Sequence, residues 1–294
     1  MASDLSTIDA TREALAKAGY LADESASLVS FLAGQLGKPV LVEGPAGVGK
    51  TELAKALSRA TGRKLVRLQC YEGLDEAKAL YEWNYKKQLL RIQVERTDAG
   101  WDDVQEDIFG PEFLLTRPLM QAISSEEPVV LLIDEIDKTD QEFEAMLLEV
   151  LSDFQISIPE MGVIESVTHP LVLLTSNNSR ELTEALKRRC LYLWLDYPSV
   201  ERELEIVRLH TPDLQESVAR RLVEVIHMVR GLDLKKPPSI AESIDWARAL
   251  LRLGADDIDA RVFTETMSII VKHRTDMDVV AERVGVKLGL GSAA

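Results

Sequence analysis

Cysteine, histidine and aromatic residues are all scarce in this chain of 294 residues, which has 2 cysteines, 4 histidines and 5% aromatics. Cys70 and Cys190 lie far apart without the spacing of metal ligands, and no histidine begins a zinc or catalytic-triad pattern. The sequence therefore argues against a disulfide framework and against a zinc site. We expect both cysteines to be small buried residues in a reducing cytosol.

Basic residues and long hydrophobic runs are also in short supply. Lysine and arginine number 34 against 49 acidic residues, a formal net charge of −15, whereas binding to a phosphate backbone needs a basic surface. No stretch approaches the length of a membrane span, and the polar N-terminal segment lacks the apolar core of a secretory signal. We expect no nucleic-acid partner, no membrane span and a cytoplasmic location.

What the chain does contain is a glycine-rich turn between an apolar run and a helical pattern, VLVEGPAGVGKTELAKAL at 40–57. From Gly44 to Thr51 the spacing is G-x-x-x-x-G-K-[ST], in which glycines let backbone N–H groups curl around an anion beside a helix N-terminus. Lys50 can reach the β- and γ-phosphates, and the Thr51 hydroxyl can hold Mg²⁺. A chance glycine turn would lack the flanking strand and helix. We expect the nucleotide to contact Gly44, Pro45, Ala46, Gly47, Val48, Gly49, Lys50, Thr51 and Glu52.

Two carboxylates end the apolar run PVVLLIDEID at 128–137, a run that is typical of a central parallel strand buried on both faces. Asp134 can hold Mg²⁺ through water, as the acidic partner of Thr51. Glu135 can polarise the water that attacks the γ-phosphate, as a general base. Acidic residues also favour helix N-termini, and the two interpretations are compatible. The phosphate-binding turn earlier in the chain favours the catalytic one.

Asn177 and Arg189 are further candidates for the catalytic site. Asn177 ends the next buried strand, LLTSNN, where its amide can hold the attacking water beside Glu135, although an asparagine pair also suits a turn. Arg189 ends the helical segment EALKRRC, from which it should not reach phosphates bound in its own subunit. We expect it, or Arg188, to act on a neighbouring subunit as an arginine finger. The alternative is a cation that stabilises a helix C-terminus.

The order of apolar runs predicts an α/β fold. Runs at 40–42, 65–70, 128–137, 170–178 and 191–198 alternate with helical patterns, which indicates a central parallel five-stranded sheet with crossover helices. Only helical periodicity follows Tyr197-Pro198. We therefore predict a nucleotide-binding core at 1–197 and a small all-α domain at 198–294. The apolar helical faces are expected to comprise Leu28, Val29, Leu32 and Leu36 in the first domain, and Ile240, Ile244, Ala247 and Leu251 in the second.

Two segments are predicted to project from this core. FQISIPEMGVIESVT at 154–168 alternates around a turn and is expected to form a β-hairpin. An irregular acidic insertion lies at 95–107. An apolar strip beside a negative loop would steer and then dock a basic protein surface. The strip would comprise Ile156, Ile158, Met161, Val163 and Ile164, and the loop would present Asp102, Asp103, Glu106 and Asp107.

The motifs GPAGVGKT, LLIDEID, LLTSNN and LKRRC, in this order, resemble those of the AAA+ ATPases. The hairpin and the earlier insertion resemble the MoxR group, and LQCYEGLDEAKALYEWNY and PPSIAESIDWARAL are most similar to its CoxD-type branch. The resemblance covers nearly the whole chain. It implies a P-loop core followed by a helical lid, a hexameric ring, Mg-ATP-dependent hydrolysis, and chaperone-like action on a protein client. It also implies metalloenzyme maturation with a von Willebrand factor A domain partner.

One segment departs from the family pattern. Where the family commonly has a sensor arginine at the start of the lid helix, this chain reads Ser-Ile-Ala-Glu at 239–242, and Arg248 lies two turns further on. Two other functions use the same core, a nucleic-acid motor or loader and a low-turnover assembly scaffold. The acidic charge argues against the first and the intact Glu135 against the second. Without an Asn-Lys-x-Asp motif, GTP is disfavoured and ATP is expected.

Overall fold

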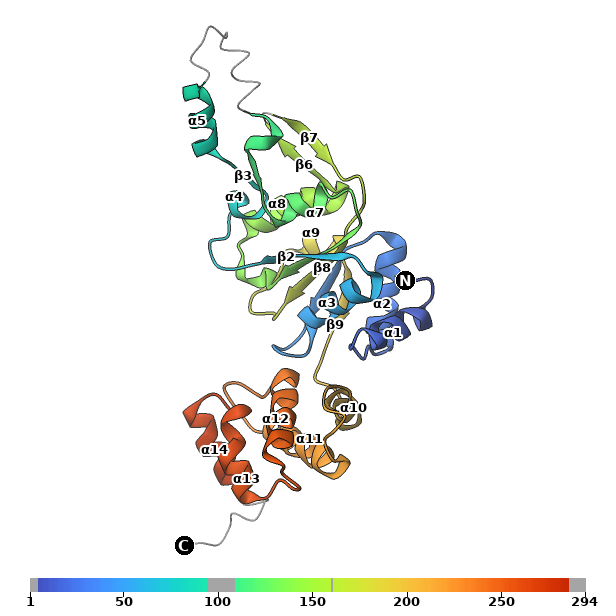
Figure 1. The fold of residues 1–294 in the computed structure, drawn as a ribbon, viewed down its shortest axis with the longest axis vertical. Helices are drawn as coiled ribbons and strands as arrows, with labels where there is room; N and C mark the ends of the chain where they lie inside the picture. Colours follow the sequence, from blue (N-terminus) through green and yellow to red (C-terminus); the bar gives the residue numbers. More distant parts are fainter. Residues whose placement is uncertain (1–4, 95–108, 160, 286–294) are drawn as a thin grey trace. The chain divides into compact units, whose positions relative to one another are not determined.

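The computed structural model describes residues 5–94, 109–159 and 161–285, in two compact units (Figure 1). The first unit comprises residues 1–44 and 50–194, and the second comprises residues 45–49 and 195–294. The domain limits predicted above, 1–197 and 198–294, stay a prediction. The acidic insertion predicted at 95–107, with its four named carboxylates, lies outside the described residues.

The central sheet of the first unit has five parallel strands, which confirms the predicted fold class. Their spatial order is β2-β5-β8-β1-β9. The strands are β1 (Val40–Glu43), β2 (Lys64–Gln69), β5 (Val129–Asp134), β8 (Leu171–Ser176) and β9 (Leu191–Trp194). Since β5, β8 and β1 are parallel neighbours, the segments that follow them emerge at the same edge of the sheet. These segments are the glycine-rich turn, Glu135 and Asn177.

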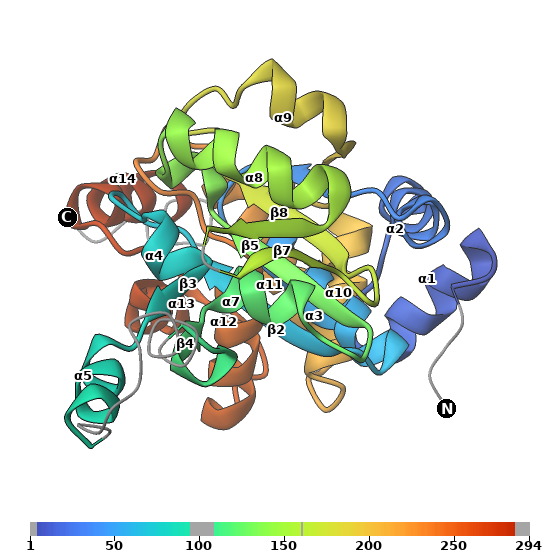
Figure 2. The same cartoon turned by 90° about the horizontal axis from the view of Figure 1, so that it is seen from above.

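Helices cover both faces of this sheet (Figures 1 and 2). Leu131 and Ile133 of β5 belong to one apolar cluster with residues of α7 and α8. Because side chains alternate across a strand, Val130 and Leu132 face the opposite side, where α3 contacts β5. The helices described in this unit are α1 (Ile8–Lys17), α2 (Glu24–Leu36), α3 (Lys50–Thr61), α4 (Glu76–Ala79), α5 (Tyr85–Val94), α7 (Pro118–Ile123), α8 (Gln141–Asp153) and α9 (Glu184–Arg189).

Short elements complete the first unit. The described residues form two antiparallel pairs, β3 (Tyr81–Trp83) with β4 (Leu114–Thr116), and β6 (Gln155–Ile158) with β7 (Gly162–Glu165). The second pair lies within the segment predicted as a hairpin. Two 3₁₀ turns, η1 (Pro111–Phe113) and η2 (Ile136–Lys138), precede β4 and follow β5.

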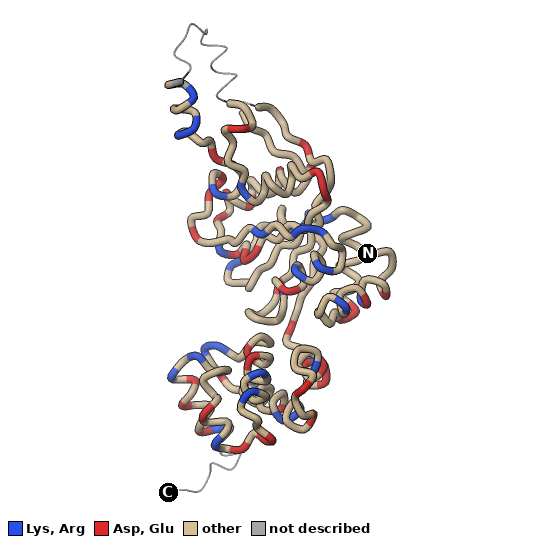
Figure 3. The backbone as a smooth tube through the Cα atoms, viewed as in Figure 1, with Lys and Arg blue, Asp and Glu red and all other residues tan. Residues whose placement is uncertain are grey.

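The second unit is helical and has its own apolar core, which includes the fully buried Trp246 and Phe263. Its elements are α10 (Val200–His210), α11 (Glu216–Arg230), α12 (Ile240–Leu253), α13 (Ala260–Thr266), η3 (Met267–Ile269) and α14 (Arg274–Gly285). Acidic and basic residues are interspersed along both units (Figure 3). Among the described residues, no helix is long and apolar enough to cross a membrane.

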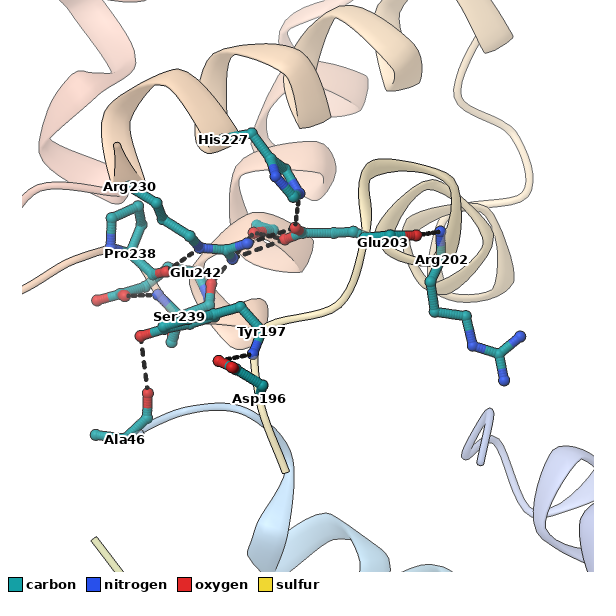
Figure 4. A network of polar contacts seen from close by, with 12 residues as sticks. Ala46, Asp196, Tyr197, Arg202, Glu203, His227, Arg230, Pro238, Ser239 and Glu242 are labelled. Carbon is teal, nitrogen blue, oxygen red and sulfur yellow. Dashed lines mark hydrogen bonds and ion pairs between the residues drawn. The ribbon is translucent and has the colours of Figure 1, made fainter. Parts of the chain in front are cut away.

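A buried carboxylate joins three helices of this unit (Figure 4). Glu203 of α10 is fully buried and accepts hydrogen bonds from the Arg230 guanidinium, the Ser243 hydroxyl at 2.6 Å and His227 Nε2 at 2.9 Å. Arg230 also donates to the Pro238 carbonyl at 2.7 Å and lies 4.5 Å from the centre of the Tyr197 ring. Within the same unit, the Tyr197 hydroxyl donates to the Ala46 carbonyl at 3.3 Å.

Several side-chain orientations predicted from periodicity are wrong. In α2 the buried residues are the small ones, Ala26, Ser27, Ser30 and Ala33, whereas Leu28 and Leu36 are exposed, since α2 packs against α1, β1 and β9 through small residues. The buried side of α12 is rotated from the predicted one, with Ser243, Trp246, Ala247 and Leu250 inside and Leu251 exposed.

The predicted apolar strip on the hairpin is also wrong. Ile156 and Ile158 are buried because β6 packs against α7 and α8, and Met161 and Ile164 pack against the same apolar cluster. Of the five residues predicted to form the strip, Val163 is the one that is exposed. The hairpin therefore contributes to the core of the first unit rather than presenting its isoleucines to a partner.

Candidate nucleotide-binding site

The glycine-rich turn has backbone angles that favour glycine. Gly47 and Gly49 have φ of 80° and 98°, a region that residues other than glycine rarely adopt, and Gly44 has φ of 151°. Helix α3 begins directly at Lys50. The first amides of α3 thus follow a turn whose backbone can curl around an anion, with the positive end of the helix dipole beside it.

Lys50 is buried, and its ammonium donates to the Gly44 carbonyl at 2.6 Å. Burial lowers the pKa of this ammonium from its usual value, and nearby carboxylates oppose the shift. These carboxylates belong to Asp137, Asp134, Glu135 and Glu43. A cation held at the turn and surrounded by acids is suited to bind phosphate and is balanced by fixed negative charge.

Asp134 connects the turn to the end of β5. Its Oδ1 accepts hydrogen bonds from the Thr51 hydroxyl at 2.9 Å and the Thr175 hydroxyl at 2.6 Å. Its Oδ2 is held by the Arg67 guanidinium, with Nε at 3.1 Å. Hydroxyl and carboxylate oxygens are the ligands that Mg²⁺ prefers, so Thr51 and Asp134 fit such an ion.

Glu135 follows Asp134 in the left-handed backbone region, with φ of 59° and ψ of 49°. Its backbone N–H donates to the Thr175 hydroxyl at 2.9 Å. The side chain is half-buried, and among the described residues no donor bonds its carboxylate. A carboxylate without a fixed partner, next to the metal-binding candidates, has the chemistry of a general base.

Asn177 lies in the turn that follows β8. Asp137, a residue of η2, is hydrogen-bonded to this turn. Asp137 Oδ2 accepts from the Ser179 hydroxyl at 2.6 Å and from the Ser179 N–H at 3.1 Å. Burial raises the pKa of Asp137, but the hydrogen bonds from Ser179 and the Asn177 backbone outweigh it, and the pKa is lowered overall. The ends of β5 and β8 are therefore tied together at the candidate site.

Arg188 and Arg189 lie elsewhere in the first unit, at the exposed C-terminal end of α9. Helix α9 is held by the fully buried Glu144 of α8, whose Oε2 accepts from the Thr183 backbone N–H at 2.8 Å and its hydroxyl at 2.7 Å. Arg180 forms an ion pair with the same carboxylate. A buried anchor thus fixes the base of the helix that presents both arginines.

The two arginines line a pocket of about 430 Å³ that contains no residue of the glycine-rich turn. Its wall is formed by the ends of α2, α8 and α9 and includes Lys38 and His169. The structure therefore brings Lys50, Thr51, Asp134 and Glu135 together and does not bring Arg189 to the turn. Glu52 was the last residue predicted to contact the nucleotide. Its carboxylate forms ion pairs with Arg59 at 2.6 Å and Lys55 at 3.4 Å.

Three residues of the site were missed by the sequence interpretation. Asp137 and Thr175 stand inside motifs already recognised, IDEID and LLTSNN, so their polar side chains were a visible signal. Arg67 had no such signal, because its contact with Asp134 depends on the pairing of β2 with β5. The segment at 239–242, which lacks the sensor arginine common in the family, forms the N-terminal cap of α12. In this cap Ser239 and Glu242 hydrogen-bond reciprocally. Arg248 pairs with Asp245 on the exposed side of α12.

Comparison with known proteins identifies the family. Residues 39–190, just over half of the chain, match the family model described as AAA domain (dynein-related subfamily). The chain is 28% identical over 240 residues to the gas vesicle ATPase GvpN of Haloferax mediterranei, covering 78% of this chain and 66% of that protein. It is 26% identical over 261 residues to GvpN1 of Halobacterium salinarum, covering 85% and 73% respectively.

The fold is shared with a solved structure as well. The chain matches RuvB of Thermotoga maritima, a Holliday junction branch migration motor, with a TM-score of 0.51 at 20% identity, covering 90% of this chain and 72% of that one. This likeness concerns the fold alone. The phosphate-binding turn, the acids at the end of β5 and the matching family model agree, and the chain belongs to the AAA family, in its dynein-related subfamily.

Proposed function

We propose that this protein is a Mg-ATP-dependent ATPase of the MoxR type, similar to its CoxD-type branch, that remodels a protein client. One observation carries the ATPase assignment. The Thr51 hydroxyl of the turn is hydrogen-bonded to Asp134 at the end of β5, with the buried Lys50 ammonium in the same turn. The names of the gas vesicle ATPase relatives support ATP hydrolysis as the activity.

In this proposal the backbone amides from Gly44 to Thr51 and the Lys50 ammonium hold the phosphates of ATP. Thr51 and Asp134 hold Mg²⁺, which when bound neutralises phosphate charge and favours attack on the γ-phosphorus. Glu135 accepts a proton from the attacking water, and the Asn177 amide orients that water. The products are ADP and phosphate.

Hydrolysis takes place between subunits of a ring, which we propose to be hexameric. The pocket that Arg188 and Arg189 line is separate from the turn, which supports a role for Arg189 toward the nucleotide of a neighbouring subunit. Arg188 is the alternative finger. Lys38 and Asp153 also line this pocket.

The client is a protein, and a chaperone-like role in metalloenzyme maturation with a von Willebrand factor A domain partner follows from the MoxR resemblance. The net charge of −15 argues against a nucleic-acid client. We propose a cytoplasmic location. Cross-linking mass spectrometry of the Glu135→Gln protein with ATP in cell extract tests this part. Cross-links to a protein of that class are expected, whereas nucleic acid that co-purifies and stimulates turnover would favour the motor or loader.

Glu135→Gln also tests the ATPase assignment directly. The amide keeps the size of the side chain and loses its basicity, so nucleotide binding should persist while turnover falls by about 10²-fold or more. Fluorescent-nucleotide binding and phosphate release are measured on the same preparation. Glu142→Gln, an exposed acid on α8, serves as the matched control. If the wild-type protein turns over and the Glu135→Gln protein releases phosphate at the same rate, Glu135 is not part of the mechanism. Negligible turnover in the wild-type protein itself would favour the low-turnover scaffold.

A further inference from the structure

A single buried hydroxyl contacts both acidic residues at the end of β5. Thr175 of β8 is 1% exposed. Its Oγ1 donates to Asp134 Oδ1 at 2.6 Å and accepts the backbone N–H of Glu135 at 2.9 Å. The metal-binding candidate and the general-base candidate are therefore joined through one side-chain atom.

The position of this hydroxyl follows from the sheet. The paired residues of β5 and β8 end at Ile133 opposite Leu174, so Asp134 and Thr175 come next on the two strands. Beyond this point β5 turns sharply, because Glu135 has left-handed backbone angles. The Glu135 N–H cannot continue the ladder from there, and the Thr175 hydroxyl provides its acceptor.

The chemistry of the two bonds requires a hydroxyl. One hydrogen is donated to the carboxylate, and a lone pair accepts the amide hydrogen, so both bonds form at once. A methyl group in the same place would do neither, and it would leave the Glu135 N–H without a buried partner. Left-handed angles are uncommon for a residue other than glycine and persist where surrounding contacts hold them.

We propose that Thr175 is a positioning residue for ATP hydrolysis, which orients Asp134 toward Mg²⁺ and holds the backbone of Glu135 so that its carboxylate faces the attacking water. Arg67 acts on the other oxygen of Asp134, and within the described part of the chain its hydrogen bonds go to Asp134 and Gln69 rather than to Glu135. The two residues thus have separable effects. This inference rests on the ATPase function proposed above.

The test compares Thr175→Val with Thr175→Ser in the full chain. Valine keeps the branched shape and removes the hydroxyl, and serine restores the hydroxyl without the methyl group. Thr61→Val is the matched control, because Thr61 is also a buried threonine in the first unit and its hydroxyl donates to the Leu57 carbonyl at 2.7 Å. Thermal unfolding of each protein is measured alongside to compare stability.

Loss of a residue that orients a metal ligand typically reduces metal affinity or activity by about 10- to 100-fold. We expect Thr175→Val to lower kcat by that factor with little change in KM. We also expect it to weaken the Mg²⁺ dependence of fluorescent-ATP binding, while binding without Mg²⁺ stays the same. Thr175→Ser should restore both properties to within a few-fold of wild type, and Thr61→Val should change neither.

A purely structural role would lower the unfolding temperature of Thr175→Val without changing its kcat or its Mg²⁺ dependence, and that result would overturn the proposal. So would failure of serine to restore activity. If the valine protein does not fold, Thr175→Ala replaces it with the same expected outcomes. If the valine and alanine proteins are both insoluble while the serine protein is fully active, Thr175 is needed for folding and the proposal is refuted. The ATPase assignment is judged separately: a Glu135→Gln protein without turnover beside a fully active Thr175→Val would refute the role of Thr175 alone.

Discussion

Replacing Glu203 by methionine should strongly destabilise the helical unit. Methionine is similar in volume but cannot accept the hydrogen bonds from Arg230, Ser243 and His227. Arg230 is itself buried, with its side chain 8% exposed. Among the described residues it would keep the Pro238 carbonyl, the Ser243 hydroxyl at 3.4 Å and the Tyr197 ring as partners, and no carboxylate to balance its charge (Figure 4). Removing one partner of a buried ion pair costs about 3–5 kcal/mol of unfolding free energy, because the other charge stays buried without compensation.

The double variant separates this cost from the value of the pair itself. With Glu203→Met and Arg230→Met together, no buried charge remains, and replacing a whole buried pair by apolar residues is often close to neutral. Ser243 and His227 still lose an acceptor, so we expect the double variant to recover at least half of the loss rather than all of it. The difference between the sum of the single effects and the double effect measures the coupling.

Urea denaturation followed by the fluorescence of Trp246, which is fully buried in the second unit, provides the measurement. Replacing Trp83, Trp101 and Trp194 by phenylalanine makes that signal specific to the helical unit. Glu205→Met is the control, since Glu205 lies on the same helix in an exposed ion pair with Arg202 and should cost about 1 kcal/mol or less. A Glu203→Met loss no larger than that of the control, or a double variant as unstable as the sum of its parts, would refute the reasoning.

Two further predictions concern the ring and the cysteines. Arg189→Ala and Lys50→Ala should each be nearly inactive alone and should regain activity when mixed, because a mixed ring contains sites with both residues intact. If activity does not recover despite verified subunit exchange, Arg188 is the finger or Arg189 only caps a helix. Burial raises the pKa of the free Cys70 and Cys190 thiols to about 12, so both are neutral below that pH. Iodoacetamide at pH 8 should therefore label them slowly in the native protein and rapidly in urea, and fast native labelling would contradict the raised pKa values.

The phosphate-binding turn and the fold class could be predicted because their signals are contiguous in the sequence. Glycines, Lys50 and Thr51 act largely through local backbone conformation, and the alternation of apolar runs with helical patterns implies crossover connections whatever the side chains touch. The acids at the end of β5 were recognisable for the same reason, since a buried run that ends in Asp134 and Glu135 indicates both a strand and its carboxyl end.

The buried sides of the helices and of the hairpin were less predictable, because hydrophobicity alone does not specify which neighbouring element each side packs against. Periodicity favoured the leucines of α2, but Ala26, Ser30 and Ala33 are buried there because close packing selects small residues. The isoleucines of β6 were expected to face a partner, and the contacts of β6 with α7 and α8 place them in the core instead.

The partners of the buried polar groups were decided by the tertiary structure alone. Arg67 reaches Asp134 across 67 positions of sequence, and Thr175 reaches Asp134 across 41. Both contacts depend on the register in which β2, β5 and β8 pair, and a shift of one residue would turn each side chain to the opposite face of the sheet. The sequence by itself thus determined the fold class and indicated the candidate residues for binding and hydrolysing a nucleotide, because these follow from local motifs and patterns. Which residues hold them in position was determined only by the pairing of distant strands, since a hydrogen bond needs a partner at a fixed distance and direction that no local pattern specifies.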